Sequence, residues 1–309
     1  MNISLNGIIN VLKPPGMSSH DVVAHIRKII GIKKIGHSGT LDPSAVGVLP
    51  IFIGRATKTV EYAIEGTKSY RAELKLGVIT DTGDKDGNII STDDWKKYFK
   101  QYNYEDTLEK VIQSFKGKSK QLPPMYSAIK INGQKLYNLA RQGKEIRRAE
   151  REIEINEINI ISSSYEEGLV LFDVDCSKGT YIRVLCEDIG RNIGCGAHMS
   201  YLIRTKSSGF CLQESHTIEE IKDIHEKNRL LEYLIPIEKL FSSYTKYVVA
   251  DENQIKMFMN GCRINIDDTT ILKDEPQVIS VYINEKLVGL ANIFEEENNK
   301  FIKVKKFFV

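Results

Sequence analysis

The sequence predicts an α+β fold on a largely antiparallel mixed sheet. Segments that alternate apolar and polar residues, as strands do, are interspersed with segments that have the apolar spacing of helices. They do not follow the regular strand–helix–strand order of a parallel α/β protein. The 309 residues suffice for a large and a small domain, and we place these at residues 1–244 and 245–309.

The chain is expected to begin with a strand, a turn and a helix. "GIINVLK" has the β-branched apolar content of a strand, and "KPPGM" must turn. Ser18 and Asp21 form a capping-box pattern at the start of a helix, which Gly31 should end. Next we expect a buried strand at "LPIFIG", a helix at "ATKTVEYAI" and a strand at "SYRAELKLGV".

The following segments continue this mixture. "DTLEKVIQSFKG" is expected to be a helix that stops at Gly117, and Asn132-Gly133 indicates a hairpin turn. "LYNLARQG" is a short helix, "REIEINEINIIS" and "GLVLFDVDCS" are strands, and "TYIRVLCEDIGRNIG" is a helix that ends at Gly194. After "SSYTK" the segments "VISVYINEKLVGLANIF" and "FIKVKKFFV" predict a small β-rich domain.

Composition is that of an ordinary globular protein, with 41% hydrophobic and 27% charged residues. No apolar run approaches the roughly 18 to 20 residues of a membrane helix, and "MNISLNGIINVLK" lacks the features of a signal peptide. We therefore expect a cytoplasmic protein that does not contact the membrane. The 5 cysteines form no CxxC pair, which predicts free buried thiols rather than disulfides or a zinc site.

Charge is unevenly distributed along the chain. The net charge of the whole sequence is only +2, yet residues 116–151 contain ten basic and two acidic side chains. Such segregation is typical of a surface that binds a polyanion. A solvated basic face fits the charge pattern equally well.

Several catalytic motifs are matched only in part. "GHSGT" has Thr40 where a nucleophile elbow needs glycine, "DTG" occurs once although an aspartic protease needs two carboxylates, and "TGDKDG" has Thr82 where a calcium loop begins with Asp. Each is better explained as turn chemistry. No Walker A, GxGxxG or HExxH motif is found, so we expect no cofactor and no metal.

The segment "GHSGTLDPSAVGVLP" places one carboxylate, Asp42, in a loop of small residues. Pro43 suits the first position of a helix, and Asp42 suits its cap. The glycines let backbone or a ligand approach closely. Spacing alone therefore favours a helix cap over a catalytic carboxylate.

The same segment resembles the catalytic motif of bacterial tRNA pseudouridine synthases of the TruB family. Further blocks resemble that family in the same order: "KPPGMSSHD", "GRATK", "SYRAELKLGVITDTGDKDG", "PPMYSAIKINGQKLYNLARQG", "CSKGTYIRVLCEDIG" and "AHMSYLIRT". The resemblance covers residues 7–240 strongly. From about residue 245 the chain is more weakly similar to the family's PUA-type domain.

The resemblance implies isomerisation of uridine 55 in the T arm of tRNA to pseudouridine. In this reaction the glycosidic bond at N1 breaks, the uracil turns in place and C5 bonds to the sugar, so no cofactor is consumed. The expected partner is the tRNA T stem-loop, no protein partner is required, and we expect a monomer. Because the target base is stacked, it must be flipped out.

The resemblance also assigns roles within the site. Asp42 is the carboxylate, which either attacks C1′ or removes the C2′ proton, and the sequence leaves both routes open. Arg183 is its expected cationic partner, a fork that fits a carboxylate, rather than a surface arginine. Tyr70 stacks on the target base, a role that the resemblance favours over that of an ordinary core aromatic. Tyr181 helps to order the site and Leu202 lines the base pocket.

His37 and a set of basic residues are expected to bind the RNA. His37 is implied to fill the space left by the flipped nucleotide, with proton transfer and a structural role as alternatives. "QLPPMYSAIKINGQKLYNLARQGKEIRR" is expected to clasp the T stem-loop, largely through backbone and shape. The expected contacts are Lys13, Lys58, Lys130, Arg147 and Arg148.

Two alternative functions stay open. Eukaryotic and archaeal relatives share the Asp-containing core but act within guide-RNA particles. A second alternative is an RNA-binding protein that helps tRNA to fold and whose catalysis is secondary. Activity on a tRNA transcript without other components tests the first, and an Asp42→Asn protein that binds tRNA without modifying it tests the second.

Overall fold

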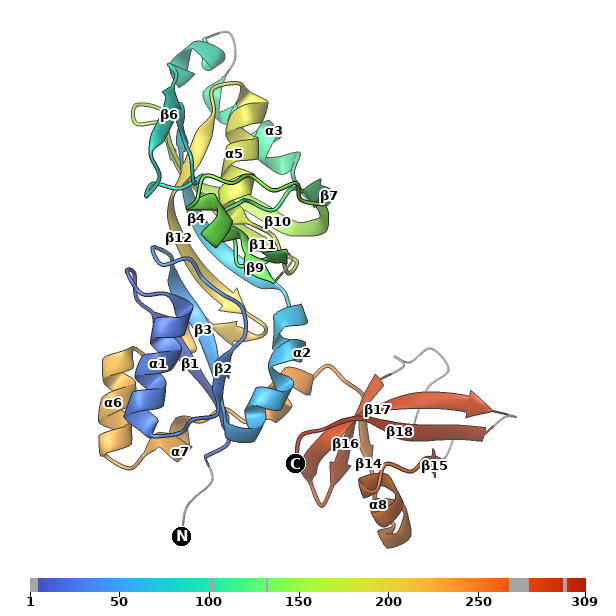
Figure 1. The fold of residues 1–309 in the computed structure, drawn as a ribbon. Helices are drawn as coiled ribbons and strands as arrows, with labels where there is room; N and C mark the ends of the chain where they lie inside the picture. Colours follow the sequence, from blue (N-terminus) through green and yellow to red (C-terminus); the bar gives the residue numbers. More distant parts are fainter. Residues whose placement is uncertain (1–4, 101–102, 132, 267–277, 297–298) are drawn as a thin grey trace.

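One mixed sheet runs through both lobes of the N-terminal part of the chain, and a small β unit lies beside the lower lobe (Figure 1). The computed structural model describes residues 5–100, 103–131, 133–266, 278–296 and 299–309. The first four residues and Asn132 of the predicted hairpin turn lie outside the described residues.

The main sheet has the order β1-β3-β12-β4-β11-β10-β7, with β2 on β3 and β13 on β12. All neighbours are antiparallel except β3 and β12, which confirms a largely antiparallel mixed sheet. The strands are β1 (Gly7–Lys13), β2 (Ile35–His37), β3 (Val46–Ile53), β4 (Lys68–Leu76), β7 (Gly117–Gln121), β10 (Arg151–Ser164), β11 (Leu169–Cys176), β12 (Ala197–Ser207) and β13 (Phe210–Cys211).

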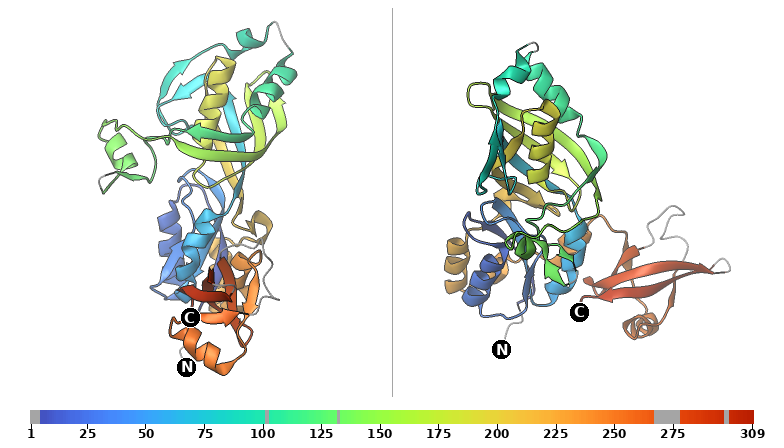
Figure 2. Two further views of the ribbon diagram at one scale, coloured as in Figure 1. Left: turned by 90° about the vertical axis from the view of Figure 1, so that its right-hand side faces the viewer. Right: turned by 45° about the horizontal axis from the view of Figure 1, so that its top comes forward.

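Helices cover this sheet on both lobes (Figures 1 and 2). On the main sheet these are α1 (Ser19–Ile30), α2 (Val60–Glu65), α3 (Tyr104–Gln113), α5 (Ile182–Ile193), α6 (Ile218–Glu226) and α7 (Leu230–Tyr233). Helix α4 (Leu136–Ala140) lies in the insertion described below, and α8 (Glu252–Met259) packs with the C-terminal sheet. Four 3₁₀ segments are Gly54–Thr59, Trp95–Phe99, Leu212–Glu214 and Ile237–Phe241. The chain also forms two short hairpins outside the main sheet: β5 (Val78–Thr80) pairs with β6 (Ile89–Thr92), and β8 (Lys130–Ile131) pairs with β9 (Gln134–Lys135).

Local sequence signals explain the ends of the helices next to the site. Ser18 and Asp21 form the predicted capping box of α1, and Gly31 ends it in the left-handed conformation. Gly194 ends α5 in the same way. The apolar face of α1 packs with α6 on β1 and β3, whereas α5 packs on the other half of the sheet with β4 and β12. Leu41 and Ala45, on either side of Asp42, belong to the core beside α5, and the N–H of Leu41 donates to the hydroxyl of Ser19 in α1.

The structure corrects four details of the predicted elements. No helix follows Pro43: residues 43 and 44 form a turn that leads into β3, so Asp42 is not a helix cap. Helix α3 ends at Gln113, and Gly117 begins β7 with φ 105°. The segment predicted as one helix after β3 divides into a 3₁₀ turn and α2. Strand β12, at the centre of the sheet, was not predicted.

An insertion leaves the sheet and returns to it at one cross-strand pair. Gln121 is the last residue of β7, and it pairs with Arg151, the first residue of β10. We call the intervening residues 122–150 the arm. It contains the predicted β8–β9 hairpin and α4, and it projects from the body of the molecule (Figure 2, green).

The C-terminal residues form a separate five-stranded sheet of order β14-β16-β17-β18-β15 with its own apolar core. Its strands are β14 (Lys246–Val248), β15 (Ile264–Ile266), β16 (Val278–Ile283), β17 (Lys286–Glu296) and β18 (Asn299–Phe307). Phe308 of this unit packs against Phe241 and Tyr62 of the N-terminal part. This packing anchors the unit beside α2.

The remaining sequence expectations concern thiols and membranes. All five cysteines are free; Cys176, Cys186 and Cys195 are buried as predicted, but Cys211 is half-buried and Cys262 is exposed. Within the described ranges, no helix combines the length and the apolarity that crossing a membrane requires.

Candidate active site

Two buried side chains, Lys13 and Ser19, hold the loop that carries Asp42 through hydrogen bonds to its backbone. Lys13 donates through Nζ to the carbonyl oxygens of Pro14, Pro43 and Ala45 at 2.8, 3.0 and 2.7 Å. Ser19, at the start of α1, accepts from the N–H of Leu41 at 2.9 Å through its hydroxyl. The backbone on both sides of Asp42 is therefore fixed to β1 and α1.

Two of the glycines in this segment are required by the geometry. Gly39 and Gly47 have φ of 98° and 118°, a region that favours glycine. A Cβ atom on Gly47 would lie 2.3 Å from the carbonyl oxygen of Arg204 in β12. Glycine thus permits the close approach of β3 and β12 beside the Asp42 loop.

Asp42 faces a buried arginine from the first turn of α5. The Nε atom of Arg183 lies 3.0 Å from Oδ2 of Asp42, and the Arg183 side chain is only 5% exposed. The expected fork on one carboxylate is not formed. Instead Nη1 donates to the carbonyl of Thr82 at 2.9 Å and Nη2 to that of Tyr126 at 2.6 Å. Arg183 thus joins Asp42 to the 81–87 loop and to the arm.

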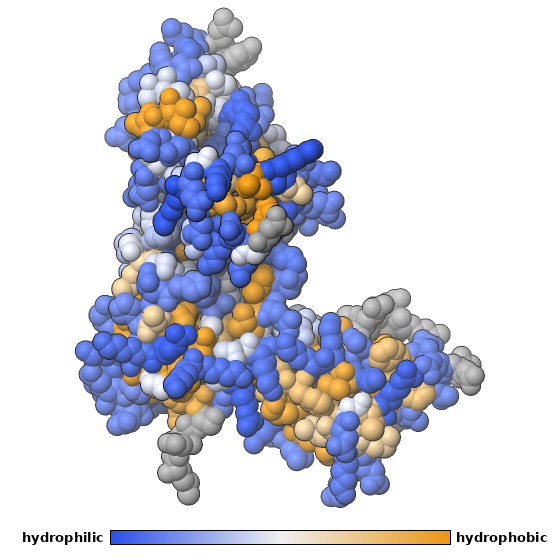
Figure 3. Space-filling view, viewed as in Figure 1, coloured by the Kyte–Doolittle hydropathy of each residue, from blue (hydrophilic) through white to orange (hydrophobic). Residues whose placement is uncertain are grey.

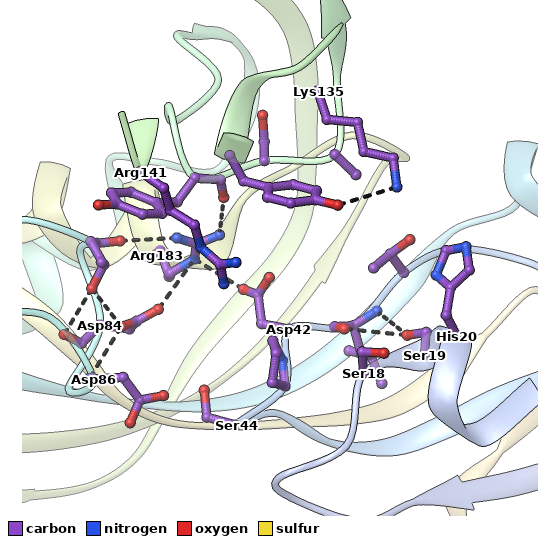
Figure 4. A pocket seen from close by; sticks show the side chains of 18 residues that line it. Ser18, Ser19, His20, Asp42, Ser44, Asp84, Asp86, Lys135, Arg141 and Arg183 are labelled. Atoms are coloured by element: carbon purple, nitrogen blue, oxygen red, sulfur yellow. Dashed lines mark hydrogen bonds and ion pairs between the residues drawn. The ribbon is translucent and has the colours of Figure 1, made fainter. Parts of the chain in front are cut away.

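A second carboxylate, Asp84, lies next to this ion pair. Its Oδ2 atom is 3.7 Å from Arg183 Nε, and Figure 4 shows Arg183 between Asp84 and Asp42. The Thr82 hydroxyl and the N–H of Asp86 donate to Asp84 at 2.6 and 3.1 Å. The sequence pattern of this loop was interpreted as turn chemistry, which it is, but its Asp84 also reaches the candidate site.

Burial raises the pKa of the Asp42 carboxyl, Arg183 opposes this shift, and the charge of Asp84 adds to it. The side chain of Asp42 still keeps 37% of its surface exposed, because it faces two cavities. Asp42 is therefore a carboxylate that ionises less readily than usual and that is open to a ligand.

Two cavities of about 550 and 650 Å³ meet at Asp42. The first lies between the N-terminus of α1 and the arm, where Figure 4 places His20 on one side and Lys135 and Arg141 on the other. The second lies over β4 and β12. Residues 127 and 128 of the arm line both cavities.

The second cavity contains the predicted base-binding residues. Tyr70, Tyr181 and Leu202 line it together with Asp42. Tyr70 and Leu202 are 9% and 7% exposed, so Tyr70 belongs to the core and to the cavity wall at once. Arg204, which the sequence analysis missed, is the cross-strand neighbour of Tyr70 and also lines this cavity.

The pKa of the Tyr70 hydroxyl is raised by burial, and the charge of Arg204 opposes that shift. Arg204 itself is almost completely buried and donates to the carbonyls of Val48 and Gly39 at 2.8 and 3.2 Å. At ordinary pH this arrangement favours a neutral Tyr70 hydroxyl beside the fixed positive charge of Arg204.

His37 lies at the end of β2, with its ring 5.4 Å from that of His20 in an edge-to-face contact. Burial and the charge of His20 lower the pKa of His37 to about 4. His37 is therefore neutral at ordinary pH, and it is not among the residues that line the two cavities at Asp42.

The basic residues expected to contact substrate are dispersed. Lys13 is fully buried and its ammonium group is used by three carbonyls, so it supports the Asp42 loop rather than facing the cavities. Lys58 donates to the carbonyl of Val309 at 2.7 Å, beside the C-terminal unit. Lys130 lines the second cavity, whereas Arg147 is exposed on the arm.

Arg148 is more buried than Arg147. Its side chain is 12% exposed and lies 3.6 Å from Glu145, and its Nε and Nη1 atoms are buried without a hydrogen-bond partner in the described chain. No group of three or more His, Cys, Asp or Glu side chains within the described ranges is arranged to hold a metal ion.

Comparisons with known proteins find relatives over almost the whole chain. Residues 27–182 match the model of the "TruB family pseudouridylate synthase (N terminal domain)", and residues 183–242 match the "tRNA pseudouridylate synthase B C-terminal domain". The chain is 47% identical to "tRNA pseudouridine synthase B" of Alkaliphilus oremlandii over 97% of both proteins. It is 44% identical to the protein of that name from Clostridioides difficile, over 99% of this chain and 100% of the relative.

Solved structures show the same fold. The chain matches the structure titled "Crystal Structure of a Cbf5-Nop10-Gar1 Complex" with a TM-score of 0.74 and 27% identity, over 98% of this chain and 85% of the other. A structure of an "H/ACA RNP bound to a substrate RNA containing 2'-deoxyuridine" matches with a TM-score of 0.72 and 25% identity, over 98% and 85% of the two chains. From the family models, the relatives and the fold, the chain belongs to the TruB family of pseudouridine synthases and is an isomerase.

Proposed function

We propose that this protein converts uridine 55 in the T arm of tRNA to pseudouridine, with Asp42 as the reacting carboxylate. The observation that carries the proposal is the Asp42–Arg183 ion pair, placed where two cavities meet. The relatives that share almost the whole chain are named tRNA pseudouridine synthase B, which supports tRNA as the substrate.

The second cavity suits a flipped uracil. Tyr70 offers an aromatic face, Leu202 offers an apolar contact, and Asp42 lies at the same cavity. An extruded base exchanges its neighbours in the RNA stack for such contacts. The uracil is held between these side chains while it is detached from the sugar and turns in place.

Asp42 then acts on the ribose in its ionised form. It attacks C1′ as a nucleophile or removes the C2′ proton to give a glycal, and both routes use the same carboxylate. Arg183 keeps Asp42 ionised and oriented, since its charge persists at any ordinary pH. Asp84 and Thr82 hold the arginine from its other side.

The pH dependence of the rate is expected to report Asp42. Because its pKa is raised, the acid limb should lie above the ordinary value of 3.8. The charged groups that act on Asp42 are Arg183, Asp84 and Lys13, and Asp84 raises its pKa. Asp84→Asn removes that charge and should shift the acid limb of the single-turnover rate to lower pH. An unchanged or higher limb would contradict this electrostatic assignment.

Tyr70→Phe separates stacking from proton transfer. The variant keeps the aromatic face and loses only the hydroxyl, so tRNA binding should be preserved. We expect the single-turnover rate to fall roughly 10²- to 10⁴-fold, because C5 must lose a proton and Tyr70 places a hydroxyl in the base cavity. A rate close to that of the unmodified protein would restrict Tyr70 to stacking.

The arm is proposed to clasp the T stem-loop. Its basic side chains lie on a segment that projects from the body and lines both cavities, and hydrophilic side chains dominate that face in Figure 3. Phosphate neutralisation by lysine and arginine supplies affinity that is independent of sequence. The flipped base then provides the specific contact.

Charge reversal tests this role. Replacing Lys130, Arg147 and Arg148 by Glu should weaken tRNA binding and flatten its dependence on salt, by a slope of about 0.7 to 0.9 for each phosphate that is no longer neutralised. A matched control is the reversal of Lys28, Lys33 and Lys34, which are exposed at the far end of α1. If tRNA binding by the two triple variants depended on salt with the same slope, the basic residues of the arm would be solvated and would not contact phosphate.

We further propose that residues 245–309 act as a PUA-type RNA-binding domain and that the protein works as a cytoplasmic monomer. The five-stranded sheet with its own core supports the domain. The solved structures named above include complexes with other proteins and a substrate RNA. The greater identity to relatives named tRNA pseudouridine synthase B favours action without a guide RNA or protein partner.

The experiment uses the purified protein alone. A tRNA transcript that carries tritium at C5 of uridine should release that tritium to water, since C5 exchanges its hydrogen for the bond to C1′. Release only after addition of a guide RNA or a second protein would replace the stand-alone activity by the guided one. Binding without release would favour the RNA-folding alternative.

A further inference from the structure

The root of the arm is attached to the first turn of α5 by the side chain of Gln121. This side chain is 4% exposed, and its amide meets both backbone groups of Tyr181, the N-cap residue of α5. Oε1 accepts from the N–H of Tyr181 at 2.8 Å, and Nε2 donates to its carbonyl at 3.1 Å. The N–H of a helix cap has no partner within the helix, so Gln121 supplies one from another element.

A second contact joins the arm to the same turn. Arg183, two residues after Tyr181, donates through Nη2 to the carbonyl of Tyr126 at 2.6 Å. Pro123 and Pro124 lie between Gln121 and Tyr126, and their fixed φ angles make this connection stiff. The arm therefore grips the start of α5 at two points, and Arg183 is part of one of them.

The arm is continuous with these contacts. The N–H of Tyr137 in α4 donates to the carbonyl of Ser127 at 3.1 Å, which ties the outer part of the arm to the residue after Tyr126. Both ends of the arm meet at the Gln121–Arg151 pair. Any force that RNA exerts on the arm thus acts at its root, beside the helix that orients Arg183.

We propose that Gln121 is a positioning residue that couples the grip of the arm on RNA to the Arg183–Asp42 pair. The inference rests on the proposed function. The amide of Gln121 fixes the first turn of α5 against the arm root, and from that position Arg183 reaches Asp42 at 3.0 Å. When RNA holds the arm in place, the same contacts hold the arginine against the carboxylate.

Gln121→Met tests the proposal, because methionine has a similar length and makes neither hydrogen bond. The matched control is Gln113→Met, which removes a 2.8 Å side-chain bond to the carbonyl of Ile158 far along β10. We expect Gln121→Met to lower the single-turnover rate at saturating enzyme by at least tenfold, with tRNA affinity within about twofold. Gln113→Met should behave like the unmodified protein.

Two further readouts identify the route of the effect. A poorly held Arg183 should shift the acid limb of the pH–rate profile to higher pH, because Arg183 lowers the pKa of Asp42. The other two charges that act on Asp42 stay in place: Asp84, which raises its pKa, and Lys13, which lowers it. In addition, Gln121→Met combined with Arg183→Lys should be no slower than Arg183→Lys alone, since Gln121 acts through the arginine.

The outcomes are distinct. If the unmodified protein makes no pseudouridine, the proposed function fails. If the protein is active, two results overturn the positioning role. The first is a Gln121→Met variant with the rate and the acid limb of the protein without substitutions. The second is a double variant whose loss in rate is the product of the losses caused by Gln121→Met and Arg183→Lys. Should the methionine variant not fold, Gln121→Glu provides the same test, because it keeps the acceptor for the Tyr181 N–H and loses the donor to the Tyr181 carbonyl. The rate and double-variant criteria then apply, but not the pH criterion, because the new carboxylate would itself raise the pKa of Asp42.

Discussion

Asp42→Ala is expected to abolish pseudouridine formation while tRNA affinity changes by less than tenfold, or ~1.4 kcal/mol. In the proposed function the carboxylate of Asp42 is the group that acts on the ribose in either mechanism. The buried neighbour Asp84 is held by Arg183, Thr82 and the N–H of Asp86, so we do not expect it to replace Asp42. In the proposed function RNA binding relies instead on the arm and on the base cavity, which the substitution leaves in place.

Asp86→Ala is a matched control for this variant. Asp86 also lines the first cavity, but it is exposed and makes no ion pair with a described residue, so its loss should leave the rate nearly unchanged. Both variants should be compared by single-turnover kinetics and by tRNA binding. Turnover by Asp42→Ala close to that of Asp86→Ala would contradict the role of Asp42.

Arg183→Lys is also expected to give a large loss. Lysine keeps the charge, but one ammonium group cannot reach Asp42, the Thr82 carbonyl and the Tyr126 carbonyl as three separate guanidinium nitrogens do. Loss of a buried partner typically costs ~3 to 5 kcal/mol, which as a barrier is roughly two to four decades in rate. Because the charge is kept, we expect a loss at or below the low end of that range.

Arg191→Lys provides the control on the same helix. Arg191 is 73% exposed and pairs with Asp188 on the surface, so the substitution should have little effect. Single-turnover conditions prevent product release from hiding the chemical step. Full-speed turnover by Arg183→Lys would remove the ion pair from the mechanism.

Elements with strong local signals could be predicted from the sequence. The capping box of Ser18 and Asp21 and the glycines that end α1 and α5 act within a few residues, so the pattern alone locates these helix ends. The alternating burial of β4 is equally visible in its sequence. These elements form the frame on which the site is built.

Strand β12 could not be predicted in this way, because it lies at the centre of the sheet between β3 and β4. Residues on both of its faces are buried, including His198 and Arg204, so polar side chains interrupt the alternation. The prediction of a helix cap at Asp42 was wrong for a related reason, because tertiary pairing decides the structure that follows Pro43. Lys13 pairs with Gly47, so the chain enters β3 directly after the turn.

The candidate site was accessible through the family resemblance and not through spacing. Asp42 and Arg183 are far apart in the sequence, and only the fold brings them to 3.0 Å. Asp84, Arg204 and Gln121 lie within segments that resemble the family, but no individual role could be assigned to them from the sequence, because their significance lies in tertiary contacts. The sequence also could not show that the Arg183 fork is divided among three partners rather than placed on Asp42.

The most direct test of the account is to map pseudouridine at single-nucleotide resolution in an unmodified tRNA transcript after incubation with the purified protein alone. We predict one new pseudouridine, at position 55 of the T arm, and none with Asp42→Asn protein that still binds the transcript. Three results would contradict the proposed function: no pseudouridine with the wild-type protein, pseudouridine at a different uridine, or as much pseudouridine with Asp42→Asn as with the wild type.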